Sequence, residues 1–262
     1  MFLNQGDDRK PPVGLQTHVA FVLILFFHSG MQYTLPLVAD TRLARVHGLL
    51  LARFGPVPEC YRLDPVSQLV FAMLSGRTRD AVAMEVFAAL ARRMGAWERL
   101  VETAASELQG IIAAVTFAER KARQIPAALR EIAARRGRLD LEFLARWPVE
   151  EGRVWLESLT GVGPKTSMAV LGLSTLHRRV LMVDTAHNRV ACRLGLVPAR
   201  ADIARATRLL NRQLPAAWTA NDTETHHFLM QGLGRSHCVY RQPLCPDCPL
   251  CRLCRSVPEG RA

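Results

Sequence analysis

One stretch constrains the fold of this chain more than any other, the eight residues Leu159–Thr166 with the sequence LTGVGPKT. Apolar residues recur at helical spacing before it, at Val154, Trp155 and Leu159, and after it, at Met168, Val170, Leu171 and Leu173. Two helices therefore meet here with almost no loop between them. Such a tight turn needs a positive φ angle, which glycine adopts without steric cost, so we expect Gly161 and Gly163 to end the first helix.

The residues after the two glycines suggest an anion site. Pro164 stands where proline is tolerated, in the first turn of the second helix. The free N–H groups of that turn, with the backbone of Gly161, Val162 and Gly163, favour a phosphate group. An ordinary αα-hairpin punctuated by glycine would show the same pattern.

Lys165 and Asp184 are the candidate catalytic pair. Lys165 follows Pro164, near the positive end of the helix dipole and partly out of water, and both effects favour the neutral, nucleophilic amine. Asp184 comes nineteen positions later, after the apolar run Val180–Val183, and can bring a carboxylate back to the same cleft. The alternative is a surface lysine and an aspartate that only caps a helix beginning at Thr185.

The cysteines near the C-terminus are the most specific indication of a metal or cluster site. Cys238, Cys245, Cys248 and Cys254 are separated by six, two and five residues, and Cys251 is a fifth thiol in the same loop. Four thiolates suit zinc or an iron–sulfur cluster. The spacing differs from the paired knuckles of structural zinc, which favours [4Fe–4S]. Cys60 and Cys192 lie in apolar contexts typical of core thiols, so a reducing compartment is expected.

Helical periodicity predicts an all-α protein. Beside the two hairpin helices, the expected helices are Leu43–Phe54, Leu69–Leu74, Val82–Leu90, Ala104–Ile112, Arg120–Ala134, Leu141–Arg146, Asp184–Arg193, Asp202–Leu214 and Thr223–Leu233, the last with His226 and His227. Only Arg179–Val183 has strand character, and it is short. We expect Arg120, Lys121 and Arg123 to form a solvated face.

The net charge of +11 comes mainly from arginine, which favours a polyanionic partner.

Residues 1–37 do not resemble part of a domain. Their apolar run Val19–Phe27 is too short to span a bilayer, and it fits a signal segment, a disordered extension, or a true start at Met31. We favour the start at Met31.

Together the hairpin, the segment Val183–Thr185 and the four-cysteine loop resemble endonuclease III, within the helix-hairpin-helix DNA glycosylase superfamily. The likeness runs from about Asp40 to Cys254. It implies two helical lobes that hold DNA between them. One is a six-helix barrel with the hairpin, residues 61–179, and the other joins 38–60 to 180–262 and carries the cluster loop.

The resemblance also implies roles. Lys165 is the expected Schiff-base nucleophile, Asp184 its carboxylate partner, and the four cysteines the ligands of a [4Fe–4S] cluster. Arg241, in the cluster loop, is an expected DNA contact. The implied activity is a bifunctional DNA glycosylase and AP lyase that removes oxidised pyrimidines. We expect a cytoplasmic monomer that acts on damaged or abasic double-stranded DNA, without a membrane.

Some positions depart from the family pattern. The loop Ser75-Gly76-Arg77-Thr78 lacks the usual glutamine that fills the gap of a flipped base, so Arg77 is the candidate for that role. Ala186 replaces a frequent histidine, His187 follows it, and Lys165 and Asp184 are one residue further apart than usual. Three alternatives stay open: an adenine-mismatch glycosylase, which lacks this lysine, a non-catalytic DNA-binding member, and a zinc-binding interaction module.

Overall fold

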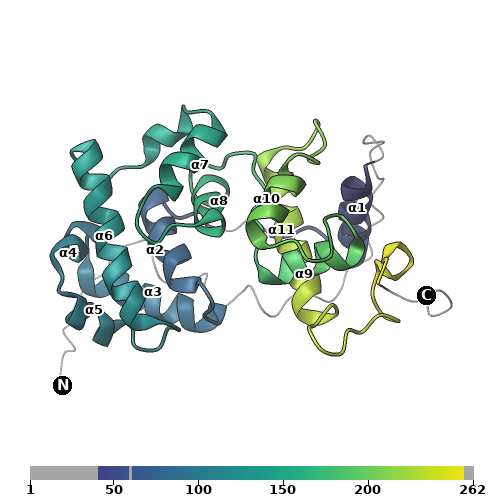
Figure 1. Cartoon of the computed structure of the whole chain (residues 1–262), viewed down its shortest axis with the longest axis horizontal. Coiled ribbons are helices and arrows are strands. Elements are labelled where there is room, and N and C mark those ends of the chain that lie inside the picture. Colours follow the sequence, from purple (N-terminus) through teal and green to yellow (C-terminus); the bar gives the residue numbers. More distant parts are fainter. Residues whose placement is uncertain (1–40, 59–60, 257–262) are drawn as a thin grey trace, which may run out of the picture. The chain divides into compact units, whose positions relative to one another are not determined.

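The computed structural model describes residues 41–58 and 61–256, and all regular structure in that part of the chain is helical (Figure 1). In chain order the elements are α1 (Arg42–Phe54), α2 (Pro65–Ser75), α3 (Asp80–Met94), α4 (Trp97–Glu102), α5 (Ala105–Ile111), α6 (Ala118–Arg136), η1 (Glu142–Ala145), α7 (Val149–Glu157), α8 (Pro164–Leu173), α9 (Thr185–Leu194), α10 (Ile203–Asn211), α11 (Ala220–Ser236) and η2 (Cys251–Leu253). The prediction of an all-α protein is confirmed.

Local sequence explains where several helices begin. A Thr or Asp side chain accepts a backbone N–H of the first turn at Thr41, Asp64, Asp184, Asp202 and Thr219. Each such cap satisfies a donor that the helix itself leaves unpaired and stabilises it by about 1 kcal/mol. Within the described residues, no helix combines the length and the apolar content needed to cross a bilayer.

Two differences from the expected helices have local causes. The segment around Leu141–Arg146 is the short 3-10 helix η1, since Asp140 accepts the N–H of Glu142 at its start and Pro148 follows closely. Helix α4 was not anticipated, because its six residues bury only Leu100 completely and leave little periodicity to detect.

A first apolar cluster joins α2–α8. Its fully buried side chains include Leu69, Leu90, Leu129, Ile132 and Val170. Burial of each such side chain contributes about 1.5–3 kcal/mol. Helix α8 therefore rests on a continuous core through Met168–Leu171, which limits how far the hairpin can move.

A second apolar cluster joins α1 to α9, α10 and α11, although α1 precedes them by more than a hundred residues. Leu43, Leu50, Leu194 and Met230 lie at its centre. The Nη2 atom of Arg42 also donates to the carbonyls of Leu194 and Leu253, each at 2.6 Å. Contacts from α1 thus reach the end of the cysteine loop, next to Cys254.

Residues 180–183 form the passage between the two clusters. This segment is extended rather than helical, so alternate side chains point to opposite sides. Val180 and Met182 pack in the first cluster, whereas Leu181 and Val183 pack in the second. The strand-like composition therefore reflects burial on both sides, without partner strands in the described chain, and it delivers Asp184 to the boundary of the two clusters. The expected division into two domains stays a prediction.

Two expectations concern residues outside the described part of the chain. One is for residues 1–37, including Met31 and the run Val19–Phe27, and the other is for Cys60.

Candidate active site

The hairpin forms as expected, with one difference in its glycines. Gly161 has φ 78°, and a Cβ atom there would lie 2.9 Å from Gln124, so both conformation and space require glycine. Gly163 has φ −119°, which any residue adopts, and no atom lies within 4 Å of a Cβ built there. The expected positive φ at Gly163 is wrong, because this residue is the extended N-cap of α8.

The turn leaves two backbone donors without an acceptor in the described chain. The N–H of Val162 donates to the carbonyl of Leu159, and its side chain is buried in the first cluster. By contrast, the N–H groups of Gly161 and Gly163 have no acceptor within the described chain. The two glycine amides are therefore the ones available to an external anion.

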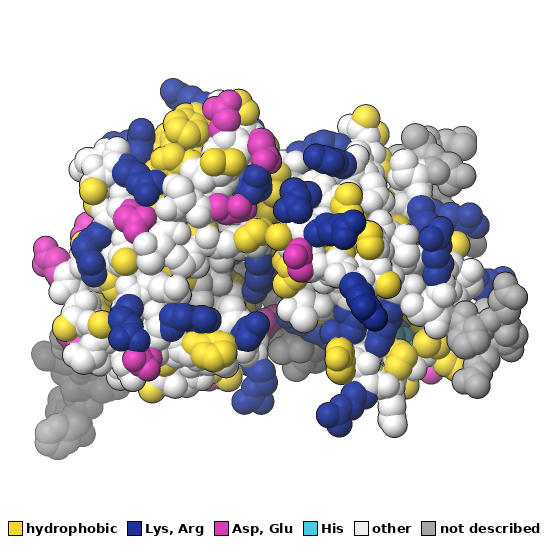
Figure 2. All heavy atoms as spheres, in the orientation of Figure 1, with side chains coloured by type: hydrophobic (Ala, Val, Ile, Leu, Met, Phe, Trp, Pro, Cys, Tyr) yellow, Lys and Arg dark blue, Asp and Glu magenta, His cyan; other side chains and the backbone are white. Residues whose placement is uncertain are grey.

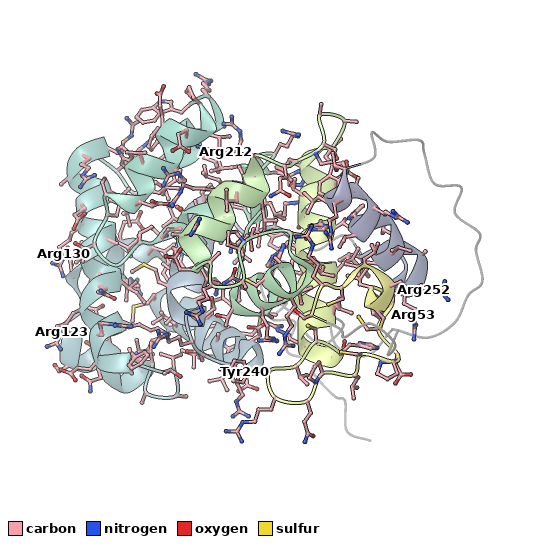
Figure 3. The ribbon with its side chains drawn as sticks, turned by 45° about the vertical axis from the view of Figure 1, so that its right-hand side comes forward. Arg53, Arg123, Arg130, Arg212, Tyr240 and Arg252 are labelled. Atoms are coloured by element: carbon pink, nitrogen blue, oxygen red, sulfur yellow. The ribbon has the colours of Figure 1, made fainter. Side chains whose placement is uncertain are left out.

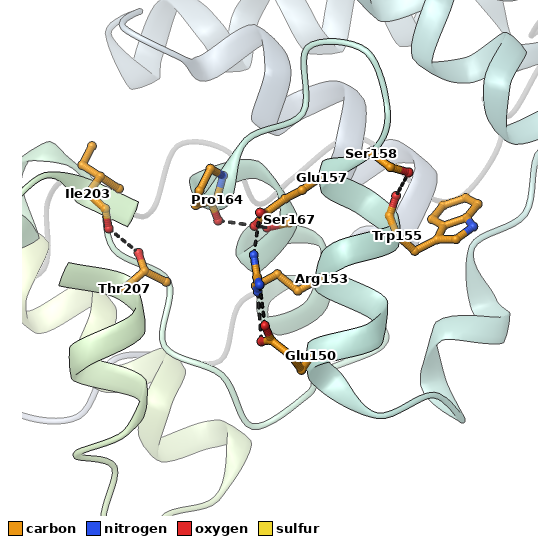
Figure 4. Close-up of polar contacts among 9 residues, drawn as sticks. All are labelled: Glu150, Arg153, Trp155, Glu157, Ser158, Pro164, Ser167, Ile203 and Thr207. Atoms are coloured by element: carbon orange, nitrogen blue, oxygen red, sulfur yellow. Dashed lines mark hydrogen bonds and ion pairs between the residues drawn. The ribbon is translucent and has the colours of Figure 1, made fainter. Parts of the chain in front are cut away.

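A polar relay fixes the second helix against the first (Figure 4). Arg153 on α7 donates to Glu157 at 2.5 Å, and the Ser167 hydroxyl on α8 donates to the other oxygen of Glu157 at 2.8 Å. The same hydroxyl lies 3.1 Å from the carbonyl of Pro164. These hydrogen bonds hold the first turn of α8, which carries Lys165.

Lys165 is largely enclosed. Its Nζ atom lies 3.3 Å from the Ser75 hydroxyl at the end of α2. Burial lowers the pKa of the amine, while the carboxylates of Asp184 and Asp80 oppose that shift and Arg235 supports it. The net shift favours the neutral amine, as nucleophilic chemistry requires.

Asp184 is the N-cap of α9 and is 7% exposed. One carboxylate oxygen accepts the N–H of His187 at 2.7 Å, and the other accepts Gln231 Nε2 at 2.6 Å. Burial alone would raise the pKa of this carboxyl, but His227, these two donors and His187 bring it below the ordinary value. The capping alternative is thus correct in geometry, and it places the carboxylate within electrostatic reach of Lys165.

Three buried histidines lie behind the carboxylate. His187, His226 and His227 are each at most 1% exposed, and the rings of His187 and His227 stack at 5.9 Å. Burial lowers the pKa of His187 to about 3 and that of His227 to about 4. Both rings are therefore uncharged at neutral pH, where the hydrogen bonds from the His187 N–H and Gln231 keep Asp184 ionised. The charge of His227 lowers the pKa of Asp184 only in acid, where that ring is protonated.

Residues of α11 and α3 complete the site, and sequence reasoning missed them. The Arg235 guanidinium lies 2.5 Å from Asp80 and 3.8 Å from Asp184, so it bridges two carboxylates around Lys165. Gln231 stands four residues before Arg235 and therefore on the same face of α11. Only the position of Asp80 in the first turn of a helix could have hinted at a role.

A cationic cavity of about 230 Å³ adjoins Lys165. Its lining consists of Ala72, Met73, Gly76, Arg77, Arg120, Lys121, Gln124, Gly161, Lys165 and Thr166, without a carboxylate. Arg77 has a left-handed φ of 56°, and its guanidinium lies 5.8 Å from the ring of the half-exposed Phe117. The expected insertion residue thus lines the same cavity as the expected nucleophile.

The prediction that Lys121 is solvated is wrong, since the residue is only 5% exposed. Arg123 and Arg130 do project outward from α6 (Figure 3). Lys121 instead faces the end of α2, where backbone carbonyls accept its protons. A run of charges in the sequence does not reveal such acceptors, because they come from a helix about fifty residues away.

The cysteine loop follows α11. Cys238, Cys245, Cys248, Cys251 and Cys254 are half-buried free thiols. Burial raises the pKa of the Cys248 thiol to about 11 against a hydrogen bond from Leu250, and Cys238, Cys254 and Cys245 raise it further. The thiols of Cys238, Cys245 and Cys254 thus lie near enough to Cys248 to raise its pKa.

Arginines hold this loop in place. Arg193 donates to the carbonyls of Val239 and Tyr240, and its Nη1 atom lies 3.2 Å from the sulfur of Cys238. Arg189 donates to the carbonyls of Gly234 and Cys238. In the described part of the chain, no three His, Cys, Asp or Glu side chains are arranged to hold a metal ion. The donor chemistry suits a four-thiolate centre, although the thiols do not converge as ligands.

Other expected residues lie at the surface or in the core. Arg241 is exposed beside Tyr240, which is 78% exposed. Cys192 on α9 is half-buried and packs against the second cluster. Lysine and arginine side chains are spread over the face shown in Figure 2, with fewer acidic ones between them.

Comparison with known proteins decides the family. The profile of HhH-GPD superfamily base excision DNA repair proteins matches residues 70–216. The chain belongs to the HhH-GPD superfamily. The matched region contains the hairpin, Lys165 and Asp184, and the resemblance to endonuclease III is confirmed by relatives and by a solved structure.

Endonuclease III of Synechocystis is 32% identical over 202 residues, which cover 75% of this chain and 84% of that protein. A proposed DNA glycosylase of Arabidopsis thaliana is 33% identical over 147 residues, which cover 56% of this chain and 50% of that protein. The match thus spans about half the length of the Arabidopsis protein. A trapped covalent intermediate of endonuclease III with DNA superposes with a TM-score of 0.68 at 25% identity, covering 82% of this chain and 97% of that chain.

Proposed function

We propose that this HhH-GPD protein is a bifunctional DNA glycosylase and AP lyase. The single observation that carries the proposal is the placement of Lys165. Its amine stands in the first turn of α8, is largely removed from water, has a lowered pKa, and feels the charge of Asp184. The first turns of two successive helices, α8 and α9, would thus supply the amine and the carboxylate of one nucleophilic centre.

Access to the sugar requires the nucleotide to leave the stack, because C1′ cannot be reached inside a duplex. The N–H groups of Gly161 and Gly163, which have no acceptor in the described chain, would bind a backbone phosphate near the lesion. Arg77 is exposed on the loop after α2 and would fill the space that the nucleotide leaves. Arg241 in the cysteine loop would contact a further phosphate.

Lys165 Nζ would then form a bond to C1′, while the glycosidic bond breaks and the base departs with the electron pair. The nitrogen bonded to C1′ gives up one proton, which the departing base takes. The C1′–O4′ bond then breaks, O4′ accepts a proton from solvent, and the resulting iminium ion acidifies the C2′ proton. Removal of that proton breaks the bond between C3′ and its phosphate oxygen, so the strand is cut by β-elimination. A neutral amine is essential at the first step.

Asp184 would stabilise the positive charge that develops on the sugar. Its carboxylate is held by the His187 N–H and by Gln231, so the charge is oriented before the substrate binds. Such preorganised charge is among the largest contributions to catalysis. The neighbouring histidines, uncharged at neutral pH, do not compete with the sugar for that carboxylate.

Cys238, Cys245, Cys248 and Cys254 would hold a [4Fe–4S] cluster. The mutual effect of these thiols on Cys248 and the position of the Arg193 guanidinium near Cys238 support this ligand set. When bound, the cluster would stiffen the basic loop that carries Arg241 and Arg252. We also propose the division into a barrel domain, 61–179, and a second domain from 38–60 and 180–262.

The proposed substrate is double-stranded DNA with oxidised pyrimidines or abasic sites, bound by a monomer. The endonuclease III relatives support this class. An assay on duplexes that each contain one lesion, scored for base release and for strand nicking, tests it. We expect both products from oxidised pyrimidines. Base release without nicking would point to a monofunctional glycosylase, and absence of both, with DNA binding retained, to a non-catalytic member.

A further inference from the structure

Lys121 is a buried cation that the proposed reaction does not use. Its Nζ atom donates to the carbonyl of Leu74 at 2.6 Å, to the carbonyl of Gly76 at 2.8 Å and to the Thr78 hydroxyl at 3.0 Å. An ammonium group has three protons and a neutral amine has two. The three acceptors therefore use the whole donor capacity of the charged form and leave none for a phosphate.

The acceptors lie at the C-terminal end of α2, where the last carbonyls lack partners inside the helix. A cation at this end also complements the helix dipole. Between the two carbonyls that Lys121 binds lies Ser75, whose hydroxyl is the contact of Lys165. Lys121 thus fixes the backbone on both sides of the residue that touches the proposed nucleophile.

The same contact orders a second loop. The Thr78 hydroxyl accepts the Thr116 N–H at 3.1 Å as well as a proton of Lys121. Next to these residues, Arg77 has φ 56° and Phe117 has φ 60°, a conformation that side chains other than glycine rarely adopt. Strained backbone of this kind persists only when its surroundings determine it.

We propose that Lys121 is a positioning residue, which holds the Ser75–Thr78 loop so that Arg77 and Ser75 are presented to the substrate and to Lys165. This inference rests on the proposed glycosylase and lyase activity. Lys121, on α6, would thereby connect the Ser75–Thr78 loop to the amine of Lys165.

The charge of Lys121 also acts on the nucleophile. Burial and the charges of Lys165 and Arg120 lower the pKa of Lys121 to about 8. Repulsion between two ammonium groups is mutual, so Lys121 favours the free amine of Lys165 at pH values below about 8, where Lys121 itself is charged. The other charged groups that face Lys165 are Asp184, Asp80 and Arg235.

The test compares Lys121→Met, which keeps the length of the side chain, with Lys121→Arg, which keeps a charged donor. Arg123→Met is the matched control, since Arg123 is on the same helix and 65% exposed. We expect single-turnover base excision to fall about tenfold to a hundredfold in Lys121→Met, with little change in DNA affinity. Lys121→Arg should recover part of that rate, and Arg123→Met should match the unaltered protein.

The second measurement is the pH dependence of borohydride trapping on abasic DNA. A purely structural role of Lys121 would leave the midpoint of this dependence unchanged. The midpoint should rise in Lys121→Met, because a neighbouring positive charge is lost, and should not rise in Lys121→Arg, which keeps that charge. Unaltered excision with an unmoved midpoint would overturn the inference. So would a loss explained by weaker DNA binding with a shallower salt dependence, which marks a phosphate contact.

A further variant protects the test against misfolding. Thr78→Val removes the shared hydroxyl but leaves the ammonium paired with two carbonyls, so excision should fall in the same direction by about threefold to tenfold. If Lys121→Met does not fold, normal excision by Thr78→Val overturns the inference. Absence of trapping and excision in the unaltered protein would instead refute the proposed function itself.

Discussion

The hairpin site and the cysteine loop contrast in how they are held. Lys165 and Asp184 stand at the first turns of two regular helices, and each helix packs on an apolar cluster. The cysteines stand in irregular chain, and arginine side chains bind its carbonyls. The hairpin site is therefore held by helix packing, whereas the cysteine loop is held by side-chain hydrogen bonds to its carbonyls. The cysteine loop should depend on the proposed cluster, and the hairpin should not.

The largest effect that separates the two regions is loss of iron. We expect pure protein to carry about four irons per chain and Cys245→Ser to carry almost none, because one ligand of the set is removed. Cys251→Ser is the matched control and should keep the iron, since Cys251 lies outside the expected ligand set. Iron analysis and visible absorbance measure both. Equal loss in the two variants would contradict the ligand set, and stoichiometric zinc would contradict the cluster.

Replacement of Asp184 should act on chemistry rather than on folding. Asn can still accept the His187 N–H, but it lacks the charge that stabilises the sugar cation, so base excision should fall about 10²- to 10³-fold. Trapping on an abasic site should persist weakly. Asp202→Asn changes a similar cap on α10 and should leave excision unaltered. A similar loss of excision in both variants would show that Asp184 is only a cap.

Arg77→Ala should give a smaller effect, on one step. A side chain that fills the gap of a flipped nucleotide acts on flipping, so base excision should fall about tenfold while nicking at a preformed abasic site is largely kept. Arg79→Ala on the same exposed loop is the control. Equal loss of both activities, with a shallower salt dependence of binding, would make Arg77 a phosphate contact.

The smallest effect is a shift in pH dependence at the hairpin site. Burial lowers the pKa of Lys165 from its ordinary value of 10.5, so the fraction of free amine, and with it the rate of trapping, should reach its midpoint below that pH. Asp80 opposes the shift, and Asp80→Asn should therefore move the midpoint further down. An upward movement would reverse the assigned electrostatics.

Much of the hairpin site could be predicted from sequence, because its signals are local. The local backbone requires glycine and proline at fixed places in the short turn before Lys165, and it favours an aspartate at the start of a helix. These requirements appear directly in the sequence as a motif. Gly163 shows the limit, since its place in the motif does not come from a positive φ.

Residues whose role depends on packing against distant segments could not be predicted from the sequence. Gln231 and Arg235 reach Asp184 from α11, and Lys121 is buried against α2, although its neighbours in the sequence are solvated arginines. The sequence shows charge, but only the fold shows which acceptors surround it. The strand-like run Val180–Val183 was ambiguous for the same reason, because its alternation serves two apolar clusters.

Borohydride trapping by Lys165→Gln tests the central claim most directly. If the Lys165 amine forms the Schiff base, the unaltered protein should give a covalent complex on abasic DNA. The variant should lose both trapping and nicking and keep most of its DNA affinity, since one charge is a small part of a +11 surface. Undiminished trapping or nicking by Lys165→Gln would contradict the assignment of the nucleophile and the proposed lyase activity with it.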